Sequence, residues 1–179
     1  MMVELLWKGS FLMKRIFILF ILILIAVGVT AWYYNRPEEP VAENVTEAVV
    51  NFVIDGDSLN ITYDGQEEKL RLIGIDAPER YNPDNTDNEQ GRIAQDYAKK
   101  AFPQGTVIYI ELGEQERDNY GRLLGYVYRD KAATQMFNLE MIEQGYAVVL
   151  TFEPNDKYED MFIRAEQKAK QEGAGFWKE

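Results

Sequence analysis

Beyond residue 46 the chain consists of short β-rich runs separated by turn residues. Asp64-Gly65 stands between two of these runs, and this dipeptide is a strong signal for a β-hairpin. The runs around it are expected to form a meander. The strands that we predict are Ala48–Ile54, Leu59–Tyr63, Glu67–Ile75, Thr106–Leu112 and Gly121–Tyr128.

Helical patterns occur once among these runs and twice after them. We predict helices over Glu89–Phe102, Asn138–Gln144 and Asp156–Glu172, the last two followed by Gly145 and Gly173, which suit a left-handed helix stop. Five short strands with one inserted helix and two more behind them favour an α+β, mainly β fold. We expect a small closed barrel with three helices rather than a parallel α/β sheet.

The composition limits the kinds of catalytic and metal-binding site that the chain can form, because it has neither histidine nor cysteine. A Ser-His-Asp triad, a cysteine nucleophile, a zinc finger and a zinc deaminase site are all excluded, and so are disulfides. A chain of 179 residues with 46% hydrophobic content has room for one domain and a tail. Any catalysis must therefore use carboxylates, arginines, lysines, tyrosines and a bound ion.

Carboxylates and arginines gather at the ends of neighbouring predicted strands. The motifs are Ile-Asp-Gly-Asp-Ser at 54–58, Arg-Leu-Ile-Gly-Ile-Asp-Ala-Pro-Glu at 71–79 and Asp-Asn-Tyr-Gly-Arg at 118–122. Asp57 and Asp76 could supply the charged oxygen ligands that Ca²⁺ prefers. Arg71 and Arg122 could bind phosphate oxygens in pairs. This constellation predicts phosphodiester hydrolysis.

In residue type, order and spacing, these motifs resemble the thermonuclease (staphylococcal nuclease) family over roughly residues 49–177. The resemblance implies a barrel of the oligonucleotide-binding (OB) type and a calcium-dependent nuclease. It also implies that DNA and RNA, preferentially single-stranded or flexible, are hydrolysed with little sequence preference to products ending in 3′-phosphates. By the family's pattern the calcium ligands are Asp57, Asp76 and the backbone carbonyl of Ala77.

The resemblance assigns the remaining site residues as well. Glu79 would activate the attacking water, Arg71 and Arg122 would stabilise the charge on the scissile phosphate, and Tyr120 would contact a terminal phosphate. Phe152 matches one of two positions on which a base stacks, and the companion position is Leu150. Most of these residues also have a plainer alternative: turn formation for the aspartates, helix initiation for Glu79, surface solubility for the arginines and core packing for Phe152.

The N-terminal residues predict export of the domain. Lys14-Arg15 precede Ile16–Tyr34, a run of 19 residues without a charge, which is near the roughly 20 needed to span a bilayer. A retained membrane anchor and a signal sequence cleaved after Ala31 are both open. We expect residues 1–34 to be this segment, 35–46 an exposed linker and 47–179 the domain, which is membrane-anchored outside the cytoplasm or secreted, and monomeric.

The net charge of the chain is negative, whereas proteins that bind nucleic acids usually present a basic surface. The chain has a net charge of −11, and the stretch after Glu79 is rich in Asp and Glu. Weak affinity for the substrate and a raised requirement for calcium are hypotheses that follow. The alternative function is an exported OB-fold module that only binds single-stranded nucleic acid and has weak or no catalysis. Such modules commonly lack part of the carboxylate and arginine set that is complete here.

Overall fold

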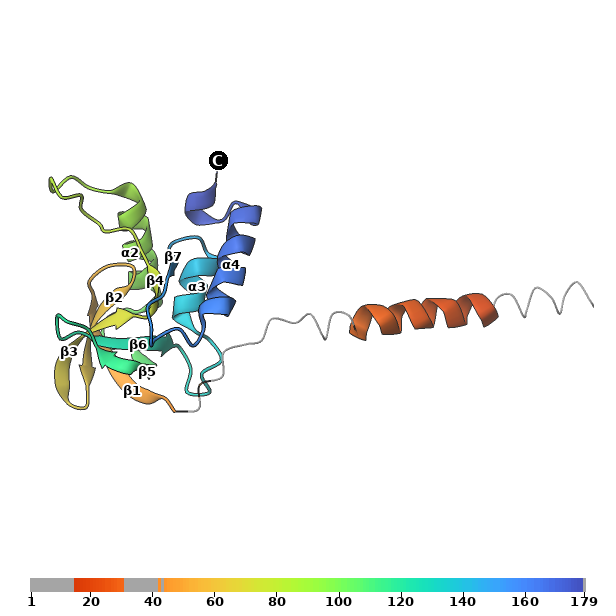
Figure 1. Cartoon of the computed structure of the whole chain (residues 1–179), viewed down its shortest axis with the longest axis horizontal. Coiled ribbons are helices and arrows are strands. Elements are labelled where there is room, and N and C mark those ends of the chain that lie inside the picture. Colours follow the sequence, from red (N-terminus) through yellow and green to blue (C-terminus); the bar gives the residue numbers. More distant parts are fainter. Residues whose placement is uncertain (1–14, 31–41, 43, 179) are drawn as a thin grey trace, which may run out of the picture. The chain divides into compact units, whose positions relative to one another are not determined.

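The computed structural model describes residues 15–30, 42 and 44–178 (Figure 1). Residues 15–30 form a helix. Within the described parts of the chain, no helix is both long and apolar enough to cross a membrane. The predicted segment Ile16–Tyr34 also includes residues 31–34, which lie outside the described residues, as does most of the predicted linker.

The domain is built on a closed barrel of five strands in the order β1-β2-β3-β6-β5 (Figure 1). The pairs are antiparallel except β3 with β6, which run parallel and join the meander to the second hairpin. The predicted OB-type barrel is confirmed. The strands are β1 (Thr46–Val53), β2 (Ser58–Tyr63), β3 (Gln66–Leu72), β5 (Val107–Arg117) and β6 (Leu123–Tyr128). Thr46, the last residue of the predicted linker, already belongs to β1.

The predicted strand Glu67–Ile75 is wrong as one element, because it breaks at Ile73. Gly74 has a φ of 79°, and a Cβ there would lie 2.4 Å from the ring of Phe162. Only glycine fits both the backbone and the space. The chain therefore leaves the barrel and forms a separate two-stranded sheet from β4 (Gly74–Asp76) and β7 (Val148–Leu150), of which β7 was not predicted.

The three predicted helices of the domain are confirmed within a few residues. They are α2 (Glu89–Ala101), α3 (Phe137–Glu143) and α4 (Glu159–Glu172), and a short 3-10 turn η1 (Gly175–Trp177) follows. The side chain of Asn88 caps the first turn of α2, and Gly173 ends α4 in the left-handed conformation. Gly145, just after α3, also has a positive φ, as its sequence position predicts.

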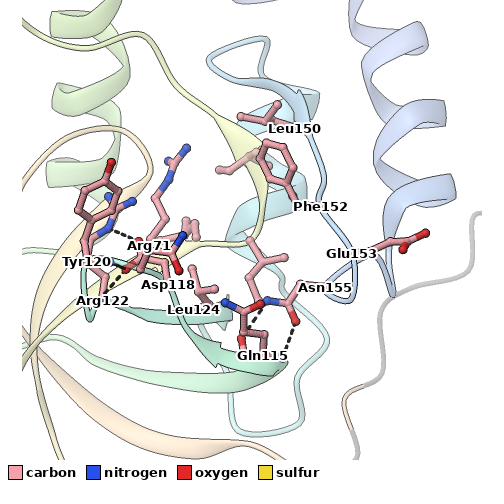
Figure 2. A pocket seen from close by; sticks show the side chains of 15 residues that line it. Arg71, Gln115, Asp118, Tyr120, Arg122, Leu124, Leu150, Phe152, Glu153 and Asn155 are labelled. Atoms are coloured by element: carbon pink, nitrogen blue, oxygen red, sulfur yellow. Dashed lines mark hydrogen bonds and ion pairs between the residues drawn. The ribbon is translucent and has the colours of Figure 1, made fainter.

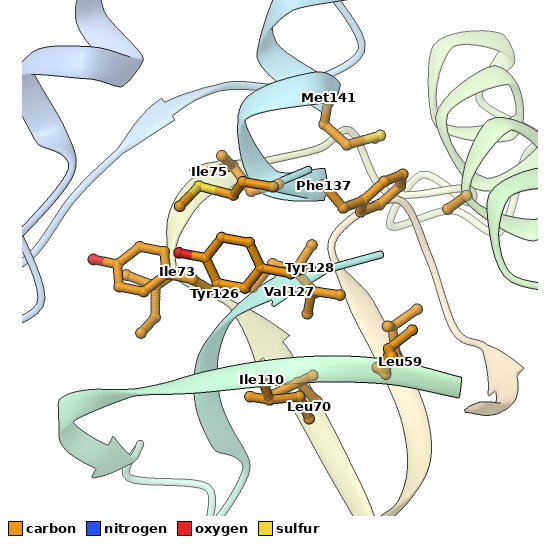
Figure 3. Packing of buried hydrophobic residues seen from close by; sticks show 14 of the residues in the cluster. Leu59, Leu70, Ile73, Ile75, Ile110, Tyr126, Val127, Tyr128, Phe137 and Met141 are labelled. Atoms are coloured by element: carbon orange, nitrogen blue, oxygen red, sulfur yellow. The ribbon is translucent and has the colours of Figure 1, made fainter. Parts of the chain in front are cut away.

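The core fills the barrel and continues beneath α3 (Figure 3). Leu70, Ile110 and Val127 point into the barrel and are almost fully buried, while Phe137 and Met141 of α3 cover one end. Successive residues of a strand point to opposite faces, so one face of each strand meets the core, and in β6 the other face is largely covered as well.

Asn138 fixes the position of α3 by polar contacts inside this core. Its Oδ1 accepts from the backbone N–H of Val127 at 2.9 Å, and its Nδ2 donates to the carbonyl of Ile73 at 2.8 Å. Because Ile73 is the residue at which β3 breaks, this buried amide holds the start of the β4–β7 sheet.

Candidate active site

The loop between β1 and β2 carries Asp57 in a nearly fixed position. The backbone N–H of Asp57 donates to Oδ1 of Asp55 at 3.0 Å, which closes a tight turn. Oδ2 of Asp57 accepts from the backbone N–H of Ala77 at 2.6 Å. A Cβ on Gly56 would lie 2.6 Å from that of Ala77, so glycine is required where the two loops meet.

Arg71, near the end of β3, joins the two aspartates that the sequence assigns to calcium. Its Nη1 pairs with Oδ1 of Asp57, and its Nη2 donates to Oδ1 of Asp76 at 2.9 Å. Asp57 is buried, with a side chain only 7% exposed, whereas the side chain of Asp76 is 51% exposed. One carboxylate is thus locked into the fold and the other reaches solvent.

Glu79 follows Pro78 on the loop that leads to α2. Its carboxyl is partly desolvated and lies near the negative charge of Asp55, and these two causes raise its pKa above the usual value. Helix α2 packs directly on its backbone, since a Cβ on Gly91 would lie 2.1 Å from the carbonyl oxygen of Glu79. The contact sets the place of the glutamate relative to the barrel.

The turn between β5 and β6 presents Arg122. Asp118 accepts from the backbone N–H groups of Tyr120 and Arg122 at 2.9 Å each, and from Nε of Arg122 at 2.7 Å. Despite partial burial, these hydrogen bonds lower the pKa of Asp118. Gly121 takes a φ of 80° within the turn. Asp118 therefore orients both the backbone and the guanidinium of this residue.

The two arginines line one pocket of about 480 Å³, shown in Figure 2. Tyr120, which is 87% exposed, and Phe152, which is 69% exposed, lie on its rim, and the guanidinium of Arg122 stands over the Tyr120 ring at 5.8 Å. Leu150 lies beside Phe152. The turn behind Phe152 is held by Asn155, whose side chain exchanges two hydrogen bonds with the backbone of Gln115.

The structure brings the predicted residues together in two connected groups. Arg71, Arg122, Tyr120 and Phe152 share the pocket, while Asp57, Ala77 and Asp76 are linked to it through Arg71 or through one another. The carboxylate of Glu79 interacts electrostatically with Arg71, Arg122 and Asp76, so it lies near both groups. Phe152 is exposed, so the alternative of core packing does not hold.

Sequence reasoning missed two residues that hold this site. Asp118 stands four residues before Arg122 in a turn motif, and its Asp-x-x-Gly pattern is the signal that could have shown its role. Gln95 lies buried on α2, and its contacts depend on the folded arrangement alone, so no local pattern could have shown its role.

The donor set fits a hard divalent cation in charge and type. Asp57 and Asp76 both contact the guanidinium of Arg71. Asp55 and Glu79 add further carboxylates nearby. Within the described residues no three acidic side chains are arranged as a metal site by themselves. Ca²⁺ takes six to eight oxygen ligands, so backbone carbonyls, water and substrate would have to complete its coordination.

Barrel and site together define an OB-fold protein with an arginine and carboxylate centre suited to phosphate esters. The sequence matches the family described as staphylococcal nuclease homologue over residues 69–179. It is 32% identical to a thermonuclease of Staphylococcus intermedius over 170 residues, which cover 92% of this chain and 99% of that protein.

Two further relatives agree. A thermonuclease of Staphylococcus hyicus is 34% identical over 70% of this chain and 72% of its own length. The endonuclease YhcR of Bacillus subtilis is 34% identical over 81% of this chain but only 12% of its own length. The chain belongs to the staphylococcal nuclease family, and it is accordingly a hydrolase of the nuclease class.

Proposed function

We propose that the protein is a calcium-dependent nuclease that hydrolyses DNA and RNA with little sequence preference and leaves 3′-phosphates. The observation that carries this proposal is the position of Arg71. Its guanidinium contacts both Asp57 and Asp76, and it also lines the pocket that contains Arg122. A phosphate held by the two arginines would thus lie beside the two carboxylates suited to a cation.

The arginines act on the phosphate. Two guanidinium groups in one pocket can share the oxygens of a phosphodiester and bind more tightly as negative charge grows on them during in-line attack. Loss of one preorganised donor typically costs about 2.7–4 kcal/mol in the transition state. Lysine replaces arginine poorly in this role, because it lacks the planar fork.

Calcium would be held by the carboxylates of Asp57 and Asp76 and by the carbonyl of Ala77. When bound it supplies positive charge next to the phosphate and makes a neighbouring water more acidic. The excess of carboxylates around Arg71 supports this assignment.

Glu79 is proposed to activate the attacking water. It is solvent-accessible, and burial and the nearby charge of Asp55 raise its pKa, so its ionised form is a better proton acceptor than an ordinary glutamate. The water oxygen forms a bond to phosphorus as the bond to the 5′ oxygen of the next nucleotide breaks. The proton from the attacking water passes to Glu79, the departing 5′ oxygen takes up a proton from solvent water, and the 3′-phosphate stays with the preceding nucleotide.

The rest of the pocket would hold one nucleotide. Phe152 offers its exposed ring for base stacking, and Tyr120 offers its hydroxyl to a terminal phosphate. Leu150 beside Phe152 gives an aliphatic second wall, which stacks less well than an aromatic ring.

We also propose that the domain works outside the cytoplasm, as a monomer. The uncharged run after Lys14-Arg15 supports export, whether that run is retained as an anchor or removed. Fractionation of cells that produce the chain would test this, and activity confined to the cytoplasm would contradict it.

The central test is degradation of denatured DNA by the full chain in detergent, with calcium and with a chelator. Glu79→Gln and Arg122→Ala should each lower kcat at least a hundredfold. Matched controls are Glu114→Gln on β5 and Arg164→Ala on α4, which are exposed and lie outside the pocket. Cleavage that continues unchanged in the chelator would refute the calcium requirement, and full activity in both site variants would refute the assigned roles.

A further inference from the structure

A second pocket, of about 230 Å³, lies at the Asp76 end of the β4–β7 sheet. Asp76 and Val148 come from the two strands of that sheet, and Gln90 comes from the first turn of α2. Phe176 and Trp177, from the 3-10 turn η1, provide aromatic surface, and Pro78 adds a further apolar wall. Of the residues that line it, only Asp76 has a role proposed above, as a calcium ligand.

The β4–β7 sheet connects this pocket to the first. In its register Gly74 pairs with Leu150, and both line the first pocket, whereas Asp76 pairs with Val148, and both line the second. Residues two apart in a strand face the same side, and they lie roughly 7 Å apart along it. The two pockets therefore follow one another along one face of the same sheet.

Arg71 links the two pockets. It lines the first and donates to the carboxylate of Asp76, which lines the second. A phosphate bound by Arg71 would consequently lie close to the first pocket, which Phe152 lines, and to the second pocket, which Trp177 lines. This is the arrangement of a phosphodiester flanked by its two nucleosides.

The aromatic wall is held in place by its backbone and its neighbours. The N–H of Phe176 donates to the carbonyl of Gly145 at 3.0 Å, and a Cβ on Gly145 would lie 2.2 Å from the carbonyl oxygen of Ala174. The ammonium group of Lys170 lies 4.5 Å from the centre of the Trp177 ring. The ring is thus presented to the pocket as a fixed surface.

We propose that this pocket binds the base of the nucleotide across the scissile phosphate from the Phe152 site, by stacking on Trp177. The inference rests on the proposed nuclease function. An unpaired base offers a flat π-face to the indole and polar edges to the side-chain amide of Gln90. Apolar walls with one such polar group are what a nucleobase requires.

A purely structural role explains the indole less well. The buried Nε1 of Trp177 has no hydrogen-bond acceptor among the residues that the structure describes. Buried indole N–H groups usually have a partner, and a phenylalanine would fill the same space without that cost. Stacking of a base uses the area and polarisability of the larger ring.

The test uses the full chain and short single-stranded DNA with one cleavable phosphodiester, in which all other linkages are methylphosphonates. Two further substrates carry an abasic residue on one side or the other of the cleavable bond. The wild type should lose about tenfold in kcat/KM when either base is removed. Trp177→Leu should lose about tenfold on the complete substrate, and it should then be insensitive to removal of one base but still sensitive to removal of the other.

Because Trp177→Leu could also loosen the C-terminal turn, Gln90→Phe provides a second variant. Gln90 is exposed on α2, and a phenyl ring there fills the pocket without altering η1. Like Trp177→Leu, Gln90→Phe should show no further loss of kcat/KM when that same base is removed, whereas Gln167→Phe on the exposed face of α4 should behave as the wild type. The proposal is overturned if each abasic substrate lowers kcat/KM of Trp177→Leu and Gln90→Phe by as much as it lowers kcat/KM of the wild type.

A binding measurement separates this inference from the nuclease function. The Trp177 fluorescence, taken as the difference between wild type and Trp177→Leu, should be quenched by a phosphorothioate oligonucleotide. An oligonucleotide that is abasic at the proposed position should not quench it. If the wild type cleaves no substrate, the nuclease proposal fails, and the quenching of Trp177 fluorescence still shows whether the second pocket binds a base. If the wild type cleaves DNA but the base neither quenches Trp177 nor changes the effect of Trp177→Leu, only the proposal of a base in the second pocket is rejected.

Discussion

The side-chain amide of Gln95 donates to the backbone carbonyl of Ile54 at 2.6 Å, so that helix α2 is tied to the loop that carries Asp55 and Asp57. The Oε1 atom of the same residue accepts from Nη1 of Arg80 at 3.0 Å. Arg80 directly follows Glu79 in the chain. One buried amide thus connects the loop of the proposed calcium ligand with the loop of the proposed water-activating glutamate.

Gln95→Leu should therefore lower kcat by about tenfold and leave KM nearly unchanged. The carbonyl of Ile54 would lose its partner, which typically costs about 1–3 kcal/mol in unfolding free energy. Steady-state kinetics and urea unfolding of the variant would measure both effects, with Gln167→Leu as the exposed control. A variant of lowered stability but unchanged kcat would show that Gln95 supports the fold and not the site.

Gly91→Ala should separate helix stability from catalysis. Alanine favours a helix by about 1 kcal/mol over glycine, but here its Cβ would lie 2.1 Å from the carbonyl oxygen of Glu79. We expect the Glu79 loop to be displaced, with kcat at least tenfold lower and little change in KM. Lys100→Ala, at an exposed position of the same helix, should leave the kinetics unchanged. If Gly91→Ala is fully active, the α2 contact does not position Glu79.

Asp118→Asn should weaken the fold at neutral pH and much less in acid. Despite partial burial, hydrogen bonds from Arg122 and Tyr120 lower the pKa of Asp118. Its ionised form therefore stabilises the folded state above the ordinary carboxyl pKa, and this contribution is lost as pH falls through the lowered value. Urea unfolding at pH 7 should show a loss of about 1–2 kcal/mol.

The same measurement near pH 3 should show a smaller difference between Asp118→Asn and the wild type. Glu114→Gln, exposed on β5, serves as the isosteric control. A difference that grows on acidification would mean that Asp118 does not act through its negative charge.

Calcium should raise the thermal stability of the full chain, because it would bind the folded state and relieve the repulsion among the carboxylates around Arg71. A ligand at a hundred times its dissociation constant adds about 2.7 kcal/mol. Calorimetry with calcium and then with a chelator would follow the shift in Tm. Asp76→Asn, at an exposed side chain, should abolish most of the shift, whereas Glu114→Gln should retain it. An equal shift in all three proteins would place calcium elsewhere.

The barrel was predictable because its signals are local. Asp64 and Gly65 both have positive φ, as the hairpin signal requires, and β2 beside them alternates polar and apolar residues. The break at Ile73 was not predictable, because it depends on Asn138 and Phe162, which lie far along the chain. The short strand β7 has too few residues for a periodic pattern, and only its pairing with β4 defines it.

The arrangement of the candidate site was predictable to the extent that its proposed residues form linear motifs. Asp57, Arg71, Asp76 and Arg122 stand in such motifs, and the structure draws them together through Arg71 and the shared pocket. The residues that support them were harder to find. Gln95 acts across 41 positions of sequence, and the contact of Gly91 with Glu79 exists only after α2 has packed.

Leu150→Tyr should strengthen the binding of a base in the first pocket. Leu150 is 39% exposed and lies beside Phe152, so a tyrosine there would add a second aromatic surface without entering the core. Stacking on an aromatic residue is worth about 1–3 kcal/mol per base, and KM for denatured DNA should fall several-fold at constant kcat. Phe152→Ala should raise KM by a similar factor.

The two substitutions should be coupled, because both rings would contact the same base. In Leu150→Tyr combined with Phe152→Ala, the gain from tyrosine should be smaller than in the wild-type background. Val107→Tyr, at an exposed apolar position on β5 outside the pocket, controls for a general effect of an added aromatic residue. A KM that is unchanged in Leu150→Tyr would show that the base does not lie between these two side chains. The role of Leu150 would then be to pack within the β4–β7 sheet.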